Sequence, residues 1–346
     1  MKKNFFLLLA LFANFACSYG QDIHFSQFYA TPLLINPAQT ALQSNARIIL
    51  NYRNQWAAFG APYQTYAFSA ETAIDHKKHS DNWGGFGISL YKDKAGDSEM
   101  GIFQGAFTGS GVVSVGEYSH LSGGVLFGYT QRSMNYSHLT WDDQYDGTNF
   151  NTAISSGEAS GNTSYHYLDL GSGLAWKYGK EEKYISANDG VRATAGISAW
   201  HFTRPNYSFV NAGQQLYTKL IAHGVVEIGL ANSNTILVPN VLIMKQGKLN
   251  EIDLGGQIKF VLKENSVYTG RIKAAAIGFG LMYRNHDAII PEFSYENSAY
   301  AFGFSYDANI SRLKAATSMQ GGFEVFLRYS ADHLFTSQYS SEAMYN

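Results

Sequence analysis

Two sets of side chains in the sequence could in principle hold a metal ion. His76 and His79 form a His-x-x-His pair, but Lys77 and Lys78 stand between them. The positive charge of the two lysines opposes cation binding, and no third ligand is apparent, whereas a zinc site needs at least three protein ligands. We therefore expect no metal at this pair.

The second set is acidic. Asp142, Asp143 and Asp146 precede Gly147, a pattern that resembles the start of a calcium loop. Such a loop ends with a bidentate glutamate at its twelfth position, which is Ala153 when counted from Asp142. We interpret the segment as a solvated acidic loop, with a loose surface calcium site as the alternative.

No combination of nucleophile, base and orienting group indicates catalysis. Gly-x-Gly runs such as Gly278-Phe279-Gly280 lie in alternating, strand-like sequence and lack the strand-to-helix turn of a phosphate-binding loop. We predict that the chain is not an enzyme and uses no cofactor. An outer-membrane hydrolase with Ser and His on neighbouring strands is kept as an alternative, because sequence does not reveal such neighbours.

The composition limits the class of protein. The 346 residues include 34 Gly, 24 Tyr and 23 Phe, and only 15% are charged, against roughly 25% in a soluble domain. The formal net charge of -2 lacks the basic excess of nucleic-acid binders, so we expect no nucleic-acid partner. Beyond the N-terminus, no stretch is apolar and long enough for a transmembrane helix, so a membrane role would require β-strands.

The N-terminus predicts export. Lys2 and Lys3 precede an apolar run from Phe5 to Phe15, and Ser18-Tyr19-Gly20 is a small-x-small cleavage site. Residues 1–20 are therefore a predicted signal peptide. The only cysteine, Cys17, lies inside it; a lipoprotein with acylated Cys17 is the alternative. The mature chain then divides into a periplasmic N-terminal segment (21–46), a barrel (47–330) and a C-terminal tail (331–346).

Alternation with a period of two predicts the barrel. Tyr300, Phe302 and Phe304 alternate with small residues, and an apolar face opposite a small, Gly-rich face is typical of a transmembrane β-barrel. Fourteen such segments are expected, so the fold class is all-β with an antiparallel barrel. They start near Arg47, Tyr63, Trp83, Met100, Tyr118, Tyr165, Gly190, Tyr217, Ile236, Asn250, Lys273, Ala288, Ala299 and Gly321.

Strand parity predicts the orientation of the barrel. If the first strand rises from the periplasm, odd-to-even connections lie outside the cell. The longest connection, from Arg132 to Ser164, then falls outside, and the short link Asn297-Ser298 falls inside. Inner links of middling length, such as Gly179 to Asp189, fit this pattern less well.

Short motifs follow one another along the mature chain. They are Gln21-Asp22-Ile23-His24-Phe25-Ser26-Gln27-Phe28-Tyr29, Asn36-Pro37-Ala38, Asn51-Tyr52-Arg53-Asn54-Gln55-Trp56, Lys92-Asp93-Lys94-Ala95-Gly96-Asp97, Tyr129-Thr130-Gln131-Arg132-Ser133, His201-Phe202-Thr203-Arg204-Pro205-Asn206, Pro239-Asn240-Val241-Leu242, Tyr283-Arg284 and Gly303-Phe304-Ser305-Tyr306-Asp307. Their order and spacing resemble the PorP/SprF family, outer-membrane proteins of the type IX secretion system. The resemblance implies an outer-membrane barrel of a Gram-negative bacterium that serves protein export and, in gliding bacteria, surface adhesins.

The resemblance also implies partners besides membrane lipid. These are type IX secretion components, including a periplasmic ring that contains a lipoprotein, or the C-terminal domain of an exported adhesin. Parity places several motifs on outer loops, where exposed polar and aromatic groups favour docking. The candidate docking residues are Arg53, Trp56, Asp93, Arg132, Arg204 and Arg284. Two alternatives stay open: Trp56 as a membrane-interface residue with Arg53 pairing to a lumen carboxylate, and a diffusion channel or uptake porin instead of a docking protein.

Overall fold

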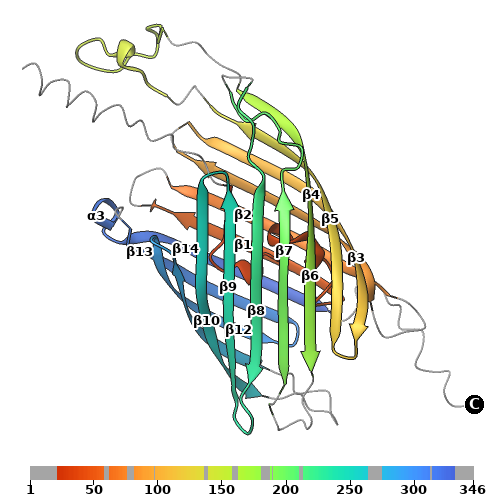
Figure 1. Ribbon diagram of the computed structural model, residues 1–346. Helices are drawn as coiled ribbons and strands as arrows, with labels where there is room; N and C mark the ends of the chain where they lie inside the picture. The colour runs from red at the N-terminus through yellow and green to blue at the C-terminus, as the bar shows by residue number, and fades with distance from the viewer. Residues whose placement is uncertain are drawn as a thin grey trace, which may run out of the picture.

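The described residues of a computed structural model form one closed β-barrel (Figure 1). They are 22–57, 62–75, 82–96, 98–135, 139–157, 163–180, 188, 190–209, 213–263, 275–311 and 314–331. The strands are β1 (Ala46–Gln55), β2 (Tyr63–Asp75), β3 (Asn82–Ala95), β4 (Met100–Gly116), β5 (Ser119–Ser133), β6 (Ser164–Lys180), β7 (Val191–Trp200), β8 (Lys219–Gly229), β9 (Thr235–Gln246), β10 (Leu249–Lys263), β11 (Ala275–Arg284), β12 (Ala288–Asn297), β13 (Tyr300–Asn309) and β14 (Gln320–Ala331).

Each strand pairs antiparallel with its neighbours in the sequence, and β1 closes the ring against β14. The predicted fold class and the expected fourteen strands are confirmed, and every predicted strand start lies within two residues of the observed one. Closure leaves no unpaired edge strand, which suits a structure surrounded by lipid.

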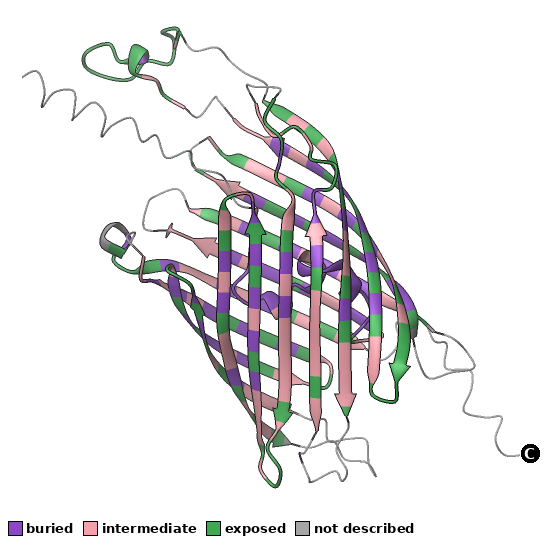
Figure 2. Ribbon diagram, in the orientation of Figure 1, coloured by how far each residue is buried: buried purple, intermediate pink, exposed green. Residues whose placement is uncertain are grey.

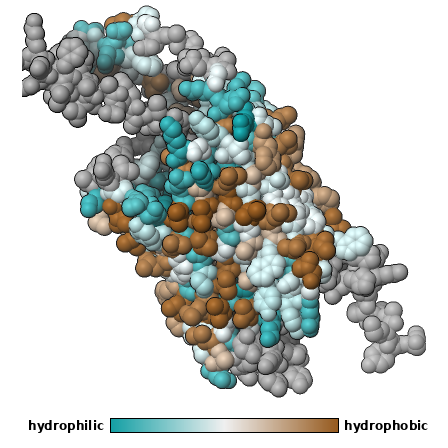
Figure 3. Space-filling model, in the orientation of Figure 1, coloured by the Kyte–Doolittle hydropathy of each residue, from teal (hydrophilic) through white to brown (hydrophobic). Residues whose placement is uncertain are grey.

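Side chains alternate between the outer wall and the lumen, as the period of two predicted. On β13, Tyr300, Phe302 and Phe304 are exposed on the outer wall, whereas Ala301 and Ser305 are buried inside (Figure 2). Hydrophobic side chains cover much of the visible wall, and hydrophilic ones gather at its upper end (Figure 3). This is the distribution of a lipid-facing barrel. Among the described residues, no helix has the length and apolar character to span a membrane.

The two ends of the barrel differ in the length of their connections. We call the end with connections 134–163 and 201–218 the long-loop end, and the end with connections 117–118 and 298–299 the short-turn end. The long-loop end is uppermost in Figure 1. That it faces the outside of the cell stays a prediction from strand parity.

The lumen is filled by the chain's own N-terminal segment, residues 22–45, which we call the plug. The plug contacts opposite walls: Ser26 N donates to Glu324 Oε1 on β14 (2.7 Å), and Asn36 Nδ2 donates to the Leu174 carbonyl on β6 (3.0 Å). It runs from Asp22, beside Gln246 at the long-loop end, to Gln43, which contacts Thr194 on β7. These residues were expected in the periplasm, and the structure instead places them inside the barrel.

Short helical turns give the plug its compact form. They are η1 (Phe28–Ala30), α2 (Pro32–Ile35) and η2 (Pro37–Gln39). Pro32 and Pro37 occupy first helical positions, where proline's fixed φ is favourable and its missing N–H costs nothing. Between them, the Asn36 side chain accepts a hydrogen bond from Ala38 N (2.9 Å) and caps the second turn.

The plug and the lumen wall share an apolar layer. Phe28 and Ile35 of the plug belong to one buried cluster with Trp200, Leu242 and Met282 of the wall. Because the last three project inward from β7, β9 and β11, they would face water if the lumen were open. The hydrophobic effect therefore retains the plug and accounts for its position inside the barrel rather than in the periplasm.

Lumen-facing glycines make room for the plug backbone. A Cβ atom added at Gly124 on β5 would overlap the backbone of Pro37 and Ala38, and one at Gly173 on β6 would overlap the Asn36 side chain. The Gly-rich lumen face expected from the sequence thus serves as a close-fitting seat for the plug.

Candidate functional site

A histidine at the long-loop end holds the start of the plug. His201 follows β7, and its Nε2 lies 2.6 Å from Asp22 Oδ2, while its Nδ1 lies 2.8 Å from Asp169 Oδ2 on β6. Lys219 Nζ on β8 is 3.9 Å from the same Asp22 oxygen. Burial alone would favour neutral His201, but Asp22 and Asp169 raise the pKa of His201 to about 9. His201 is therefore an imidazolium at neutral pH and joins the plug to two strands.

The start of the plug is expected to loosen in alkali. The folded-state pKa of His201, about 9, exceeds the unpaired value of about 6.5, so the stabilisation is complete below about pH 6.5 and is lost as pH rises through 9. Hydrogen exchange of residues 22–31 should accelerate between pH 8 and 10 beyond the intrinsic increase. His201→Gln should exchange faster at pH 7 and lack the extra pH dependence; identical profiles for both proteins would contradict the assignment.

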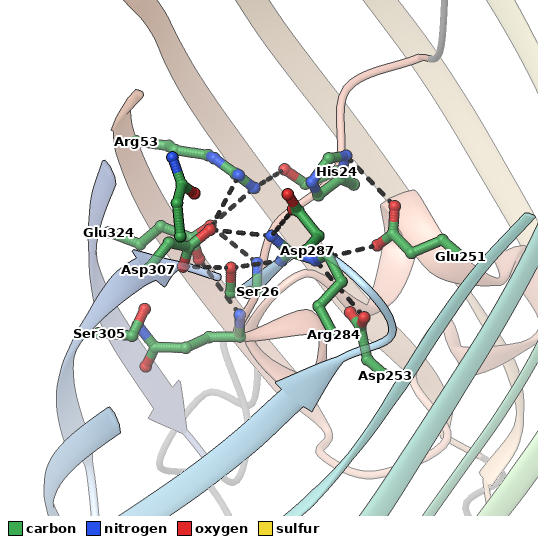
Figure 4. A network of polar contacts seen from close by, with 12 residues as sticks. His24, Ser26, Arg53, Glu251, Asp253, Arg284, Asp287, Ser305, Asp307 and Glu324 are labelled. Atoms are coloured by element: carbon green, nitrogen blue, oxygen red, sulfur yellow. Dashed lines mark hydrogen bonds and ion pairs between the residues drawn. The ribbon is translucent and has the colours of Figure 1, made fainter. Parts of the chain in front are cut away.

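Two buried arginines, Arg53 and Arg284, join the plug and four strands in one network (Figure 4). Arg53 on β1 donates to the His24 carbonyl (2.6 Å) and pairs with Glu324 (2.9 Å) and Asp307 (3.1 Å). Arg284 on β11 donates to Ser26 Oγ (2.6 Å) and pairs with Asp307 (2.9 Å).

Further carboxylates complete the network. Asp253 and Glu251 of β10 lie 3.4 and 3.6 Å from Arg284 Nε, and Asp287 lies 3.5 Å from its Nη1. His24 Nδ1 of the plug is 3.6 Å from Glu251. Every strand that contributes a carboxylate is thus tied to the plug through an arginine or a plug residue.

The structure places most of the predicted docking residues inside the barrel. Arg53, Asp93, Arg132 and Arg284 are buried. Asp93 accepts a hydrogen bond from Thr65 Oγ1 (2.6 Å), so it belongs to the lumen wall. Strand parity turns each side chain inward, where Arg53 and Arg284 meet carboxylates, Arg132 meets an aromatic ring and Asp93 meets the Thr65 hydroxyl. For Arg53, the alternative of a lumen carboxylate partner is the one observed.

Arg132, Trp56 and Arg204 lie nearer the mouth of the long-loop end. Arg132 sits 4.0 Å above the centre of the Tyr207 ring and so fixes connection 201–218 to β5. Trp56 is half-buried, with its ring edge-on to Tyr63 at 5.3 Å. Arg204 is exposed. Of the six predicted docking residues, only Arg204 is fully accessible to a partner.

A compact extension in the longest connection, residues 139–157, is here called the arm. Its fold is held by its own hydrogen bonds: Gln144 accepts from Trp141 N (3.1 Å) and from Asn151 N (2.8 Å), and its Nε2 donates to the Ile154 carbonyl (3.1 Å). Gln144 is buried, whereas the side chains around it point outward. The arm lies above the barrel in Figure 1.

The tip of the arm combines two aromatic rings with acidic groups. Tyr145 and Phe150 pair in a short bridge, their rings 5.3 Å apart and 51% and 54% exposed. Asp146 Oδ1 accepts hydrogen bonds from Thr148 N and Asn149 N, which lower the pKa of Asp146 and keep it charged. Asp142 and Asp143 are exposed beside it.

The alternative of a loose calcium site at Asp142, Asp143 and Asp146 gains no ligand set from the fold. The Asp146 oxygen that could face a cation instead caps its own turn. Within the described ranges, no group of three or more His, Cys, Asp or Glu is arranged to hold a metal. His76, His79, the signal peptide with Cys17, and residues 332–346 of the tail lie outside the described residues.

The sequence interpretation missed the plug and its contacts. One signal was available: Leu242 and Met282 occupy lumen-facing parity positions, yet such large apolar side chains do not suit a water-filled lumen. Their presence on several strands indicates an apolar occupant. Nothing in the sequence pattern identified residues 22–45 as that occupant.

Comparison with known proteins gives a fold-level likeness and a family. The chain is similar to the P. putida toluene transporter TodX (10% identity, 88% of this chain and 94% of that one, TM-score 0.43). It is also similar to the monoaromatic hydrocarbon channel CymD (11% identity, 88% and 93%, TM-score 0.40) and to BamA from Haemophilus ducreyi (9% identity, 83% and 71%, TM-score 0.39). No curated protein matches the chain. The family model of the type IX secretion system membrane protein PorP/SprF matches residues 17–329, which is nearly the whole chain and every strand but the end of β14. The chain therefore belongs to the PorP/SprF family of type IX secretion system membrane proteins.

Proposed function

We propose that this outer-membrane barrel holds an exported protein at the long-loop end, with the arm as the principal contact. Membership in the family associates the chain with secretion components, and the finer role of docking is the proposal. One observation carries it: the lumen is occupied by the plug, while the long-loop end presents a self-supported arm with an exposed aromatic pair.

The chemistry of the arm indicates the kind of partner surface. Exposed Tyr145 and Phe150 are suited to an apolar pocket, since aromatic residues dominate the energy of many interfaces. Asp142, Asp143 and Asp146 add negative charge, and no Lys or Arg occurs between residues 133 and 163. A partner with a basic rim around an apolar pocket fits these groups, and its association should slow as salt screens the charges.

The plug weighs against the alternative of a diffusion channel. Small solutes would have to pass the layer in which Phe28 and Ile35 contact the wall, and this layer is closely packed. The buried Arg53 and Arg284 pair with Asp307 and contact plug residues, rather than lining an open path.

Pull-down of the C-terminal domain of an exported protein tests the proposal. The variant Tyr145→Ser/Phe150→Ser should capture at least about thirtyfold less, since a hot-spot aromatic contributes about 2 kcal/mol or more. Tyr118→Ser removes an exposed aromatic ring from the short-turn end and is the matched control. Equal capture by wild type and the arm variant, with loss in the control, would place docking at the short-turn end and favour a periplasmic partner.

A further inference from the structure

Near the long-loop end, the outer wall changes from polar to apolar over three successive outward-facing positions of neighbouring strands. Facing outward in register are Asn54, Gln64 and Lys94; then Tyr52, Tyr66, Lys92 and Phe103; then Leu50, Phe68 and Leu90. The first row is thus polar, the second combines three aromatic rings with the ammonium of Lys92, and the third is wholly apolar. This succession is typical of the boundary between lipid headgroups and hydrocarbon.

The wall is hollowed at this boundary. A groove of about 550 Å³ crosses β13, β14, β1, β2 and β3 and reaches Phe103 on β4. Its walls include outward-facing Leu50, Tyr66, Leu90, Phe302 and Leu327, each at least 40% exposed. Next to Leu90, β4 presents only Gly105, so no side chain covers that edge of the row.

A cationic group stands at the polar side of the groove. Lys92 lines it, is exposed, and lies in register between Tyr66 and Phe103. Its neighbour Lys94 pairs with Glu99, whereas no carboxylate of the described residues lies within ion-pair distance of Lys92. An ammonium beside an apolar groove at the headgroup boundary complements an anionic headgroup with an attached acyl chain.

We propose that this groove binds one molecule of lipid A, with a phosphate at Lys92 and an acyl chain along Leu90, Phe68 and Leu50. This proposal rests on the same premise as the proposed function, that the long-loop end faces the outside of the cell. The groove then lies in the outer leaflet, which carries the phosphorylated glycolipid. The groove lies on the barrel wall and contains no arm residue. A variant can therefore lose lipid binding and keep cargo docking, or the reverse.

Native mass spectrometry of the purified full-length barrel with added lipid A tests the site. The wild type should retain one lipid A, and Lys92→Gln should weaken binding about fivefold, the usual effect of one lysine at an anionic lipid surface. Leu90→Trp, which fills the groove, should also lower occupancy. Lys245→Gln removes an exposed lysine from β9, outside the groove, and should bind like the wild type.

Heat-modifiable migration of each variant on gels confirms that its barrel is folded. Unchanged affinity in both Lys92→Gln and Leu90→Trp would overturn the proposal. Retention of a glycerophospholipid in preference to lipid A would overturn it as well, because the groove would then lie in the inner leaflet. Capture of the exported domain by these variants should stay at the wild-type level, which separates the lipid site from the docking surface.

Discussion

Deleting residues 22–43 is expected to turn a sealed barrel into a conducting pore. The plug fills the lumen with buried Phe28, Leu33 and Ile35, and without these side chains water and ions can enter between the strands. The variant should also lose several kcal/mol of stability, since burying each large apolar side chain contributes about 1.5 to 3 kcal/mol. Planar bilayer recordings should show stepwise increases in current for the variant and none for the wild type.

A pair of glycine variants provides the control for this prediction. Gly124→Val inserts atoms where the backbone of Pro37 and Ala38 lies, so it should displace the plug and produce intermittent conductance. Gly128→Ala adds a Cβ that meets Ala106 and Asp169 at 3.6 Å, an ordinary contact, so the barrel of this variant should not conduct. A deletion variant that folds yet never conducts would show that the strands themselves close the lumen.

Arg284→Met is expected to cost about 3 to 5 kcal/mol of stability, because it leaves buried carboxylates without their counter-charge. Asp307 would still pair with Arg53. Asp253, however, is fully buried and would lose its ion-pair partner Arg284. The measurement is the temperature or denaturant concentration at which the barrel loses its compact gel mobility.

Lys94→Met is the matched control for the buried arginine. Lys94 pairs with Glu99, and both side chains are more than 40% exposed, so the loss should be about 0 to 1 kcal/mol. Capture of the exported domain by folded Arg284→Met should equal that of the wild type. If capture is lost while stability is unchanged, Arg284 acts as a docking residue despite its burial.

The sequence predicted the strands of this barrel but not the plug inside it. Alternation such as Phe302, Gly303, Phe304 and Ser305 is a local property, because a strand turns successive side chains to opposite faces. Strand number, register face and the positions of the long connections follow from that local rule. The plug depends on contacts between residues far apart in the chain, such as Ser26 with Glu324, which no local pattern encodes.

The same reason explains why three of the predicted docking residues lie inside the lumen. The residue type and nearness to outer loops of Arg53, Arg132 and Arg284 favour docking, yet each lies at an inward-facing strand position. The parity that correctly placed Phe304 outside also places Arg53 inside, on the opposite face from Tyr52. Alternation along the strands thus distinguishes the three buried arginines from Arg204, which is in a loop.

The path of the plug restricts the order of assembly. Asp22 lies at the long-loop end, Asn45 leads into β1 at the short-turn end, and the ring closes only when β1 pairs with β14. Residues 22–45 must therefore thread the interior before or while this seam forms. A folded tag joined ahead of Asp22 would have to be carried across the membrane with the plug, so it should block assembly, whereas a short epitope inserted in the arm should be tolerated.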